Sequence, residues 1–287
     1  MIRKQLQEMN KKDRKKSALL GAVIGDIAGS RFEFRNYKKK KDYHLITEKC
    51  FFTDDSVMSV AVAKGLMESA PSFAGLAENA ANSMQQLGRR YPEAGYGGRF
   101  YNWIFSDNPQ PYGSYGNGAA MRVGPCGQAA KSLSEAKSFS RTVTEITHNH
   151  PEALKGAEAT ATAVYLAKAG KSREEIREVI EREYYRIDFT LDSIRKNYRF
   201  DVSCQGSVPQ ALEAFFESLD FEDAVRNAIS IGGDSDTIAA ICGSIAGSYY
   251  GVPQKLEEAA LPLFDDFIKG IIYKFEEYCF HEGRSFS

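Results

Sequence analysis

Two glycine-striped segments, 17-SALLGAVIGDIAGS-30 and 232-GGDSDTIAAICGSIAGSYYG-251, decide the fold of this chain. In both segments glycine recurs every four residues of an apolar helical pattern, at Gly21, Gly25 and Gly29 and at Gly243, Gly247 and Gly251. A glycine inside a helix costs about 1 kcal/mol relative to alanine. Three on one stripe therefore indicate that another backbone approaches very closely. We predict a central helix pair that fixes a functional site.

Helical periodicity dominates the remaining chain. Apolar side chains recur at three- and four-residue spacing over 54–68, over 152–168, after Thr237 and over 261–280. Alternation with a period of two, which would indicate strands, is hard to find. An all-α fold is therefore predicted.

No linker or break in composition divides the chain, so we predict one domain over residues 17–287. A basic N-terminal helix or tail is expected at residues 1–16. Residues 91–118 are rich in glycine, proline and tyrosine and are predicted to form a long loop region with one short helix. Loops of this length inside a compact domain are usually functional.

Composition excludes several classes of protein. The formal net charge of −1 provides no overall field that would attract nucleic acid or a membrane surface. The five cysteines include no CxxC pair, so neither a disulfide framework nor a thiolate zinc site is indicated. The apolar stretch 17–29 contains Asp26 and is shorter than the ~20 residues that span a bilayer. We expect a cytoplasmic protein without a nucleic-acid or membrane partner.

Carboxylates and hydroxyls gather where two predicted helices begin. The groups are Thr53, Asp54 and Asp55 at the first start and Asp234, Asp236 and Thr237 at the second. Helix capping explains one such motif, but a cap uses only one or two of these groups. Hard oxygen ligands of this kind suit Mg²⁺, Mn²⁺ or Ca²⁺ rather than zinc or copper. If the two motifs meet in space, they could hold two ions about 3.5–4 Å apart.

One further acid, Asp26, lies within the first glycine-striped segment, and another, Glu33, follows it. Asp26 is interpreted as a buried, hydrogen-bonded structural acid. Glu33, in a loop between aromatic residues, is a candidate for a role beside the two acidic motifs. Taken alone, Glu33 is an ordinary loop glutamate.

Five motifs in a fixed order resemble a known family. They are Gly25-Asp26 with Gly29-Ser30 and Glu33-Phe34, Thr53-Asp54-Asp55, Gly116-Asn117-Gly118-x-Ala120-Met121-Arg122, Thr147-His148, and Gly232-Gly233-Asp234-Ser235-Asp236-Thr237. This set resembles the ADP-ribosylglycohydrolases, which include the dinitrogenase reductase-activating glycohydrolase and the ADP-ribosylarginine and ADP-ribosylserine hydrolases. The resemblance extends from about Ser17 to Gly251. Two departures are Ser235, where many members have threonine, and Ala119, where many have serine or glycine.

The resemblance implies an orthogonal multi-helix bundle with a dinuclear Mg²⁺ or Mn²⁺ site in a cleft. It implies the following roles: metal ligands Thr53, Asp54, Asp55, Asp234, Asp236 and Thr237; catalytic Glu33, Asp55 and Asp234; a diphosphate loop at Gly116, Asn117, Gly118, Ala119 and Met121; and a ribose contact at His148. The cluster Tyr96, Tyr101, Phe105, Tyr112 and Tyr115 supplies candidates for stacking the adenine, and at least half of it is expected to pack the loop instead. Tyr112 is the adenine contact that we select.

The function implied is metal-dependent hydrolysis of the bond between ADP-ribose and an acceptor, with arginine on a protein as the first choice. Alternatives are a non-catalytic ADP-ribose-binding protein and a two-metal phosphoester hydrolase. The partner is expected to be an ADP-ribosylated protein or small molecule, and the chain a monomer. The basic run Lys38–Lys41 is interpreted as solvated, or as a contact for an acidic partner.

Overall fold

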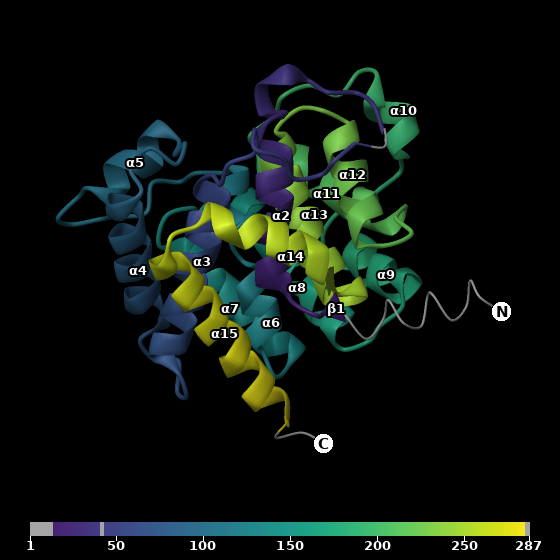
Figure 1. Cartoon of the computed structure of the whole chain (residues 1–287). Helices are drawn as coiled ribbons and strands as arrows, with labels where there is room; N and C mark the ends of the chain where they lie inside the picture. Colours follow the sequence, from purple (N-terminus) through teal and green to yellow (C-terminus); the bar gives the residue numbers. More distant parts are fainter. Residues whose placement is uncertain (1–13, 41–42, 285–287) are drawn as a thin grey trace.

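Helices form nearly all of the regular structure in the computed structural model, which describes residues 14–40 and 43–284 (Figure 1). The elements, with 3₁₀ helices labelled η, are β1 (Arg14–Lys15), α2 (Ala18–Ser30), η1 (Glu33–Arg35), α3 (Asp54–Ser69), α4 (Leu76–Arg90), α5 (Gly98–Ile104), η2 (Asn117–Ala119), α6 (Gly124–Ala129), α7 (Leu133–Glu145), α8 (Pro151–Lys168), α9 (Arg173–Glu183), α10 (Leu191–Arg195), α11 (Cys204–Phe216), α12 (Phe221–Ser230), α13 (Ser235–Tyr250), β2 (Val252–Pro253), α14 (Gln254–Ala260), η3 (Leu261–Leu263) and α15 (Asp266–Arg284). The prediction of an all-α fold is confirmed.

Helices α2 and α13 form the centre of the molecule, with α3, α4 and α5 on one side and α10, α11 and α12 on the other (Figure 1). A Cβ atom added to Gly21 would lie 2.0 Å from the carbonyl oxygen of Gly243. One added to Gly25 would lie 2.0 Å from that of Ala239. Only glycine permits this approach, so the predicted close contact of two backbones is confirmed. Gly251 has another role, because it ends α13 with a φ of 77°.

The start of α2 is fixed by side chains from distant helices. Ser17 caps the helix by accepting a hydrogen bond from the Leu20 N–H (2.9 Å) and donates its own proton to Glu276 (2.6 Å). Gln128 accepts from the N–H groups of Ala18 and Leu19 at 2.7 and 3.0 Å. The first-turn N–H groups of a helix have no partner within it. In the buried helix α2, the Gln128 side chain from α6 supplies the acceptor.

Two stretches differ from the sequence-based expectation. Residues 261–280, predicted as one helix, divide into η3 and α15, because the chain is extended at Phe264 and the Asp265 carboxylate caps α15 by accepting from the Ile268 N–H (3.0 Å). Of the predicted basic helix or tail at 1–16, Arg14 and Lys15 form β1, which pairs antiparallel with β2. Residues 1–13 lie outside the described part of the chain.

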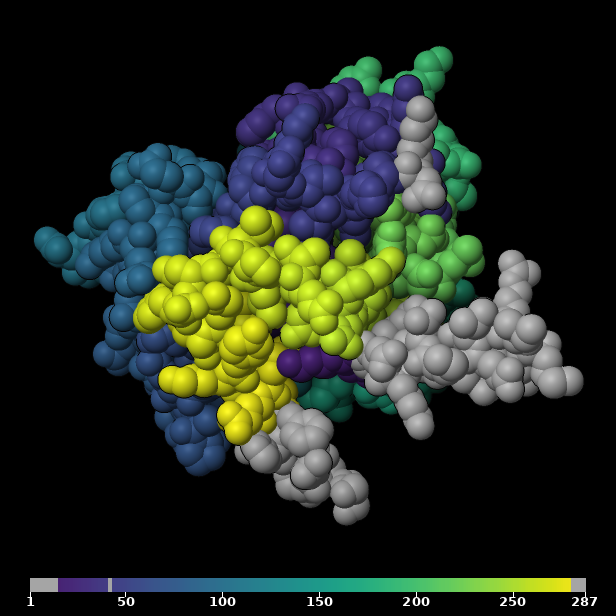
Figure 2. Space-filling model, in the orientation of Figure 1, coloured from purple at the N-terminus to yellow at the C-terminus, as the bar shows by residue number. Residues whose placement is uncertain are grey.

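The outer helices cover this central pair. In the space-filling view the C-terminal helices α14 and α15, in yellow, cover the middle of the visible face (Figure 2). Residues 91–118 are mostly loop, as predicted, but they contain the helix α5 and the start of η2 instead of one short helix. Across residues 14–40 and 43–284 we find no helix whose length and apolar character would let it cross a membrane.

Candidate functional site

A cleft of about 450 Å³ opens where the two acidic motifs meet the 91–118 region. Its lining includes the acidic-motif residues Glu33, Asp54, Asp55, Asp234, Asp236 and Thr237, together with Arg99, Tyr112, Gly116, Asn117, Gly118, Met121, Arg122 and His148. The predicted site residues are therefore largely brought together. Thr53 and Ala119 are buried and are not part of the lining.

The first acidic motif is held by Asp26. This buried carboxylate on α2 accepts from the Thr53 N–H (2.9 Å) and hydroxyl (2.8 Å). It also accepts from the N–H (3.1 Å) and the hydroxyl of Ser56. Burial raises the pKa of Asp26 to about 6, although these bonds favour its charged form. Asp26 thus fixes the start of α3 and directs Asp54 and Asp55 to the cleft. This is the structural role that the sequence analysis gave it.

The second acidic motif follows a turn of two glycines. Gly232 and Gly233 have φ values of 67° and 74°, in the left-handed region that favours glycine. Asp234 then starts α13 without forming a side-chain cap. Its carboxylate instead accepts from the Asn117 side-chain amide (2.7 Å). The motif also lies against α2, because a Cβ added to Gly29 would be 2.5 Å from the Cα of Asp236.

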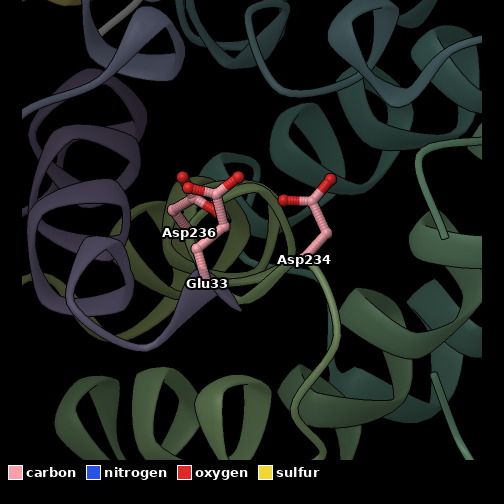
Figure 3. Close-up of side chains that lie close together, drawn as sticks. All are labelled: Glu33, Asp234 and Asp236. Carbon is pink, nitrogen blue, oxygen red and sulfur yellow. The ribbon is translucent and has the colours of Figure 1, made fainter. Parts of the chain in front are cut away.

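The two motifs meet at Asp55. One carboxylate oxygen of Asp55 accepts from the hydroxyl of Thr237 (3.3 Å) and lies 3.4 Å from the Thr53 hydroxyl oxygen, whose proton goes to Asp26. Glu33, Asp234 and Asp236 each offer one oxygen, and these three atoms all lie within 4.8 Å of one another. Figure 3 shows that the three carboxylates point to the same side. Carboxylates from three separate segments thus share one small region.

Burial and mutual repulsion disfavour the charged forms of these acids. Burial, followed by the charge of Asp26, raises the pKa of Asp54 to about 8, and it raises that of Asp55 far above the usual range. The pKa of Asp236 is raised in the same way, first by burial and then by Asp234. Burial, with Asp234 and Asp26, raises the pKa of Glu33 to about 7. Within the described residues none of these acids forms an ion pair with a basic side chain.

The donor set fits divalent cations. One oxygen each of Asp55 and Asp236 is buried with no hydrogen-bond partner within the described part of the chain. Buried carboxylates without a partner are costly, and a bound cation would remove that cost. All of the ligand atoms are oxygens, which suit Mg²⁺ or Mn²⁺ and not a thiolate-bound zinc.

The glycine loop, residues 116–121, is anchored to residues 200–204, a segment that the sequence analysis did not identify. The Asn117 N–H donates to the Val202 carbonyl (2.7 Å), and the Cys204 N–H donates to the Tyr115 carbonyl (3.0 Å). Phe200 and Val202 line the cleft. No motif or periodicity in this segment distinguishes it from an ordinary loop.

The predicted substrate contacts occupy different depths of this region. His148 is buried behind the loop, 5.7 Å from the ring of Tyr112 between centroids. Tyr112 in turn lies under the Arg99 guanidinium, 4.8 Å from the ring centroid. Of the predicted aromatic cluster only Tyr112 is part of the lining; Tyr101 on α5 packs against Phe105, which follows that helix.

The basic run after Glu33 is only partly solvated. The Lys38 amine donates to the backbone carbonyls of Tyr198 (2.7 Å) and Ile231, and burial lowers its pKa to about 8. Lys40 pairs with Asp223 at 2.6 Å, and Lys41 lies outside the described residues. Lys38 thus ties the Glu33 segment to the turn that precedes Asp234.

Comparison with known proteins places this site in a family. The sequence model of the ADP-ribosylglycohydrolase family matches residues 7–272. The chain therefore belongs to the ADP-ribosylglycohydrolase family, and it is a hydrolase that acts on ADP-ribosyl bonds.

Individual relatives agree with this assignment. The chain is 27% identical to human ADP-ribosylhydrolase ARH3, over 84% of its own length and 86% of that protein. It is also 27% identical to ADP-ribosylarginine hydrolase Tri1 of Pseudomonas putida (strain GB-1), over 86% and 74% of the two lengths. A solved structure described as an ADP-ribosylglycohydrolase-related protein complex matches the fold with a TM-score of 0.64 at 24% identity, covering 89% of this chain and 98% of the other.

Proposed function

We propose that the protein removes ADP-ribose from arginine side chains of modified proteins in a reaction that depends on Mg²⁺ or Mn²⁺. The single observation that carries this proposal is that one cleft is lined both by the acids of the two motifs and by two arginines and a glycine loop. The acids suit cations beside the distal ribose, and the loop and arginines suit a diphosphate.

The metal ligands in this proposal are Thr53, Asp54, Asp55, Asp234, Asp236 and Thr237, with Glu33 beside them. Bound cations would orient the ribose hydroxyls and lower the pKa of a bound water. Asp26 is excluded from the ligand set, because both of its oxygens already accept hydrogen bonds from Thr53 and Ser56. Its role is to hold the α3 motif in place.

Glu33, Asp55 and Asp234 are the acids that move protons in this proposal. Hydrolysis breaks the bond between the anomeric carbon and the acceptor nitrogen, while a water oxygen takes that position on the ribose. One proton leaves the water, and one must reach the departing nitrogen. Glu33 suits this exchange best, because its carboxylate lies beside those of Asp234 and Asp236 and is only partly buried, so it can reach both a water and the departing nitrogen.

The glycine loop and the arginines would bind the ADP part. Glycine-rich loops that begin a helical turn expose N–H groups that suit phosphate oxygens, and Gly116, Asn117, Gly118 and Met121 line the cleft. Arg99 and Arg122 add positive charge. Tyr112 offers a ring for the adenine, and His148 a ring nitrogen for the ribose or phosphate oxygens. Ala119 supports the loop from behind the lining.

Arginine as the acceptor is supported by the wall beside Glu33. Phe34 and Phe200 stack there with centroids 5.8 Å apart and remain 83% and 48% exposed. The planar guanidinium of arginine stacks on aromatic faces, so these rings offer it a surface beside a carboxylate. The similarity to an ADP-ribosylarginine hydrolase points to the same acceptor. In keeping with this chemistry, we propose a cytoplasmic monomer whose partner is an ADP-ribosylated protein.

The test is release of free ADP-ribose from an ADP-ribosylarginine peptide with Mg²⁺, with Mn²⁺ and with EDTA. We expect metal-dependent release that is lost in Asp234→Asn and kept in Asp188→Asn, a matched change at an exposed acid. Serine-linked and nucleobase-linked substrates tested in parallel identify the acceptor. Binding of ADP-ribose without its release from any of these substrates would favour the non-catalytic ADP-ribose-binding protein. Cleavage of a simple phosphodiester would favour the two-metal phosphoester hydrolase.

A further inference from the structure

A buried polar chain behind the glycine loop joins Arg122 to the adjacent residues Thr147 and His148. The Arg122 guanidinium donates to the Thr147 hydroxyl oxygen at 2.6 Å. That hydroxyl lies 2.7 Å from Nδ1 of His148. All three side chains are at most 5% exposed. Water therefore has little access to these contacts, and the protein itself determines where the hydrogens lie.

Counting hydrogens assigns the direction of each bond. Arginine can only donate, so the Thr147 oxygen accepts from Arg122 and has one proton of its own to place. Its possible acceptors are the Thr144 carbonyl at 3.4 Å and Nδ1 of His148 at 2.7 Å. If Nδ1–H donated to Thr147, the hydroxyl proton would have only the weak 3.4 Å contact, whereas a hydroxyl that donates to Nδ1 forms a hydrogen bond of normal length. The Thr147 hydroxyl therefore donates to Nδ1.

The charge state of the imidazole agrees with this direction. Burial, with the positive charges of Arg122 and Arg99, lowers the pKa of His148 well below its usual range, so the ring is neutral. A neutral imidazole has one N–H. With Nδ1 acting as an acceptor, the proton must be on Nε2.

We propose that Arg122 and Thr147 are positioning residues that hold His148 as its Nε2–H tautomer, which presents a fixed hydrogen-bond donor to an oxygen of bound ADP-ribose. Nε2 faces the glycine loop, since Cβ atoms added to Gly116 and Gly118 would lie 3.6 and 3.5 Å from it. The opposite tautomer would direct a lone pair at the same oxygen and repel it. The identity of the ligand rests on the proposed function, whereas the tautomer does not.

The tautomer can be read directly from the free protein. Long-range ¹H–¹⁵N spectra of ¹⁵N-histidine-labelled protein distinguish a protonated from an unprotonated ring nitrogen at each of the four histidines. A His148→Gln variant assigns the signal. We expect Nε2 protonated and Nδ1 unprotonated at neutral pH in the wild type and in Thr147→Ser. Thr147→Val should lose this preference. A protonated Nδ1 in the wild type, or an unchanged ring in Thr147→Val, would overturn the proposal.

Calorimetric titration with ADP-ribose tests the consequence. Thr147→Val should bind about tenfold more weakly than the wild type, as expected for one misdirected hydrogen bond to a charged group. Thr147→Ser, which keeps the hydroxyl, should bind like the wild type. Equal affinity in Thr147→Val would contradict the positioning role. Failure of the wild type itself to bind ADP-ribose would refute the proposed function, while the spectrum of the free protein would still decide the tautomer.

Discussion

The starts of α3 and α13 bring similar acids to one cleft, but they are held there in different ways. At α3, the Asp26 carboxylate accepts bonds from the backbone and hydroxyl groups of Thr53 and Ser56. At α13, Asp234 forms no cap; the motif lies against the α2 backbone at Gly29, and Asp234 accepts one side-chain bond from the Asn117 amide. The α3 motif thus depends on a buried carboxylate, and the α13 motif on a close backbone contact together with one amide. Substitutions at Asp26 and in the glycine stripe should show how much each kind of support contributes to stability.

The largest effect should come from the glycine stripe. In Gly25→Ala the new Cβ would lie 2.0 Å from the Ala239 carbonyl oxygen, so α2 and α13 must separate. We expect a loss of about 4 kcal/mol or more in the free energy of unfolding, measured by denaturant titration. The same substitution at Gly270 in α15 meets nothing within 4 Å and should stabilise by about 0.5–1 kcal/mol. Equal unfolding midpoints for the two variants would show that the close contact is not what holds α13.

Asp26→Ala tests the polar support of α3. The backbone N–H groups of Thr53 and Ser56 would lose their buried acceptor, at about 3 kcal/mol of unfolding free energy. Ser235→Ala is the matched change at α13, where the hydroxyl only donates to the Gly233 carbonyl at 3.3 Å. It should cost less than about 1 kcal/mol. If both variants lost the same stability, the two helix starts would be held alike.

Metal removal tests what the two motifs do together. Raised pKa values, about 7 for Glu33 and about 8 for Asp54, mean that the folded metal-free protein keeps protons that the unfolded chain releases above about pH 4. Stability without metal should therefore fall as the pH rises from about 4 to 8. Bound cations would offset the repulsion, so Mg²⁺ or Mn²⁺ at 100 times Kd should raise the Tm by about 5 °C. The rise should grow with pH.

Thermal unfolding with metal and with EDTA across this pH range is the measurement. Asp236→Asn removes one of the repelling charges and should flatten the pH dependence of the EDTA-treated protein. A metal-induced change in Tm that is the same at every pH would contradict the assignment of these acids as ligands.

The smallest predicted effect concerns a residue that supports only the α13 motif. The Asn117 amide donates to Asp234 (2.7 Å) and Ser207 (2.9 Å). Asn117→Ala should weaken metal binding about tenfold by freeing Asp234 to rotate, as measured by calorimetry. Asn108→Ala, on the exposed part of the same region, is the control. Unchanged affinity in Asn117→Ala would mean that the α2 contact alone orients Asp234.

Much of the site could be predicted because its signals are local. Thr53, Asp54 and Asp55 stand together at a helix start, and so do Asp234, Asp236 and Thr237, so each motif is visible within a few residues. The glycine stripes indicated close backbone contact, since glycine in a helix interior has a cost that needs a cause. The break at Phe264 was missed because the apolar pattern continues through it while Asp265 caps a new helix.

The sequence by itself determined the all-α class, the two acidic motifs and the need for a close backbone contact, because these depend on local periodicity and on the chemistry of a few adjacent residues. Only the tertiary structure decided that Lys38 ties the Glu33 segment to Tyr198 and Ile231, and that Phe200 stacks on Phe34. The tertiary structure also placed the Thr147 hydroxyl between Arg122 and Nδ1 of His148. Such contacts join residues far apart in the chain or depend on exact hydrogen-bond distances, and neither leaves a periodic trace in the sequence.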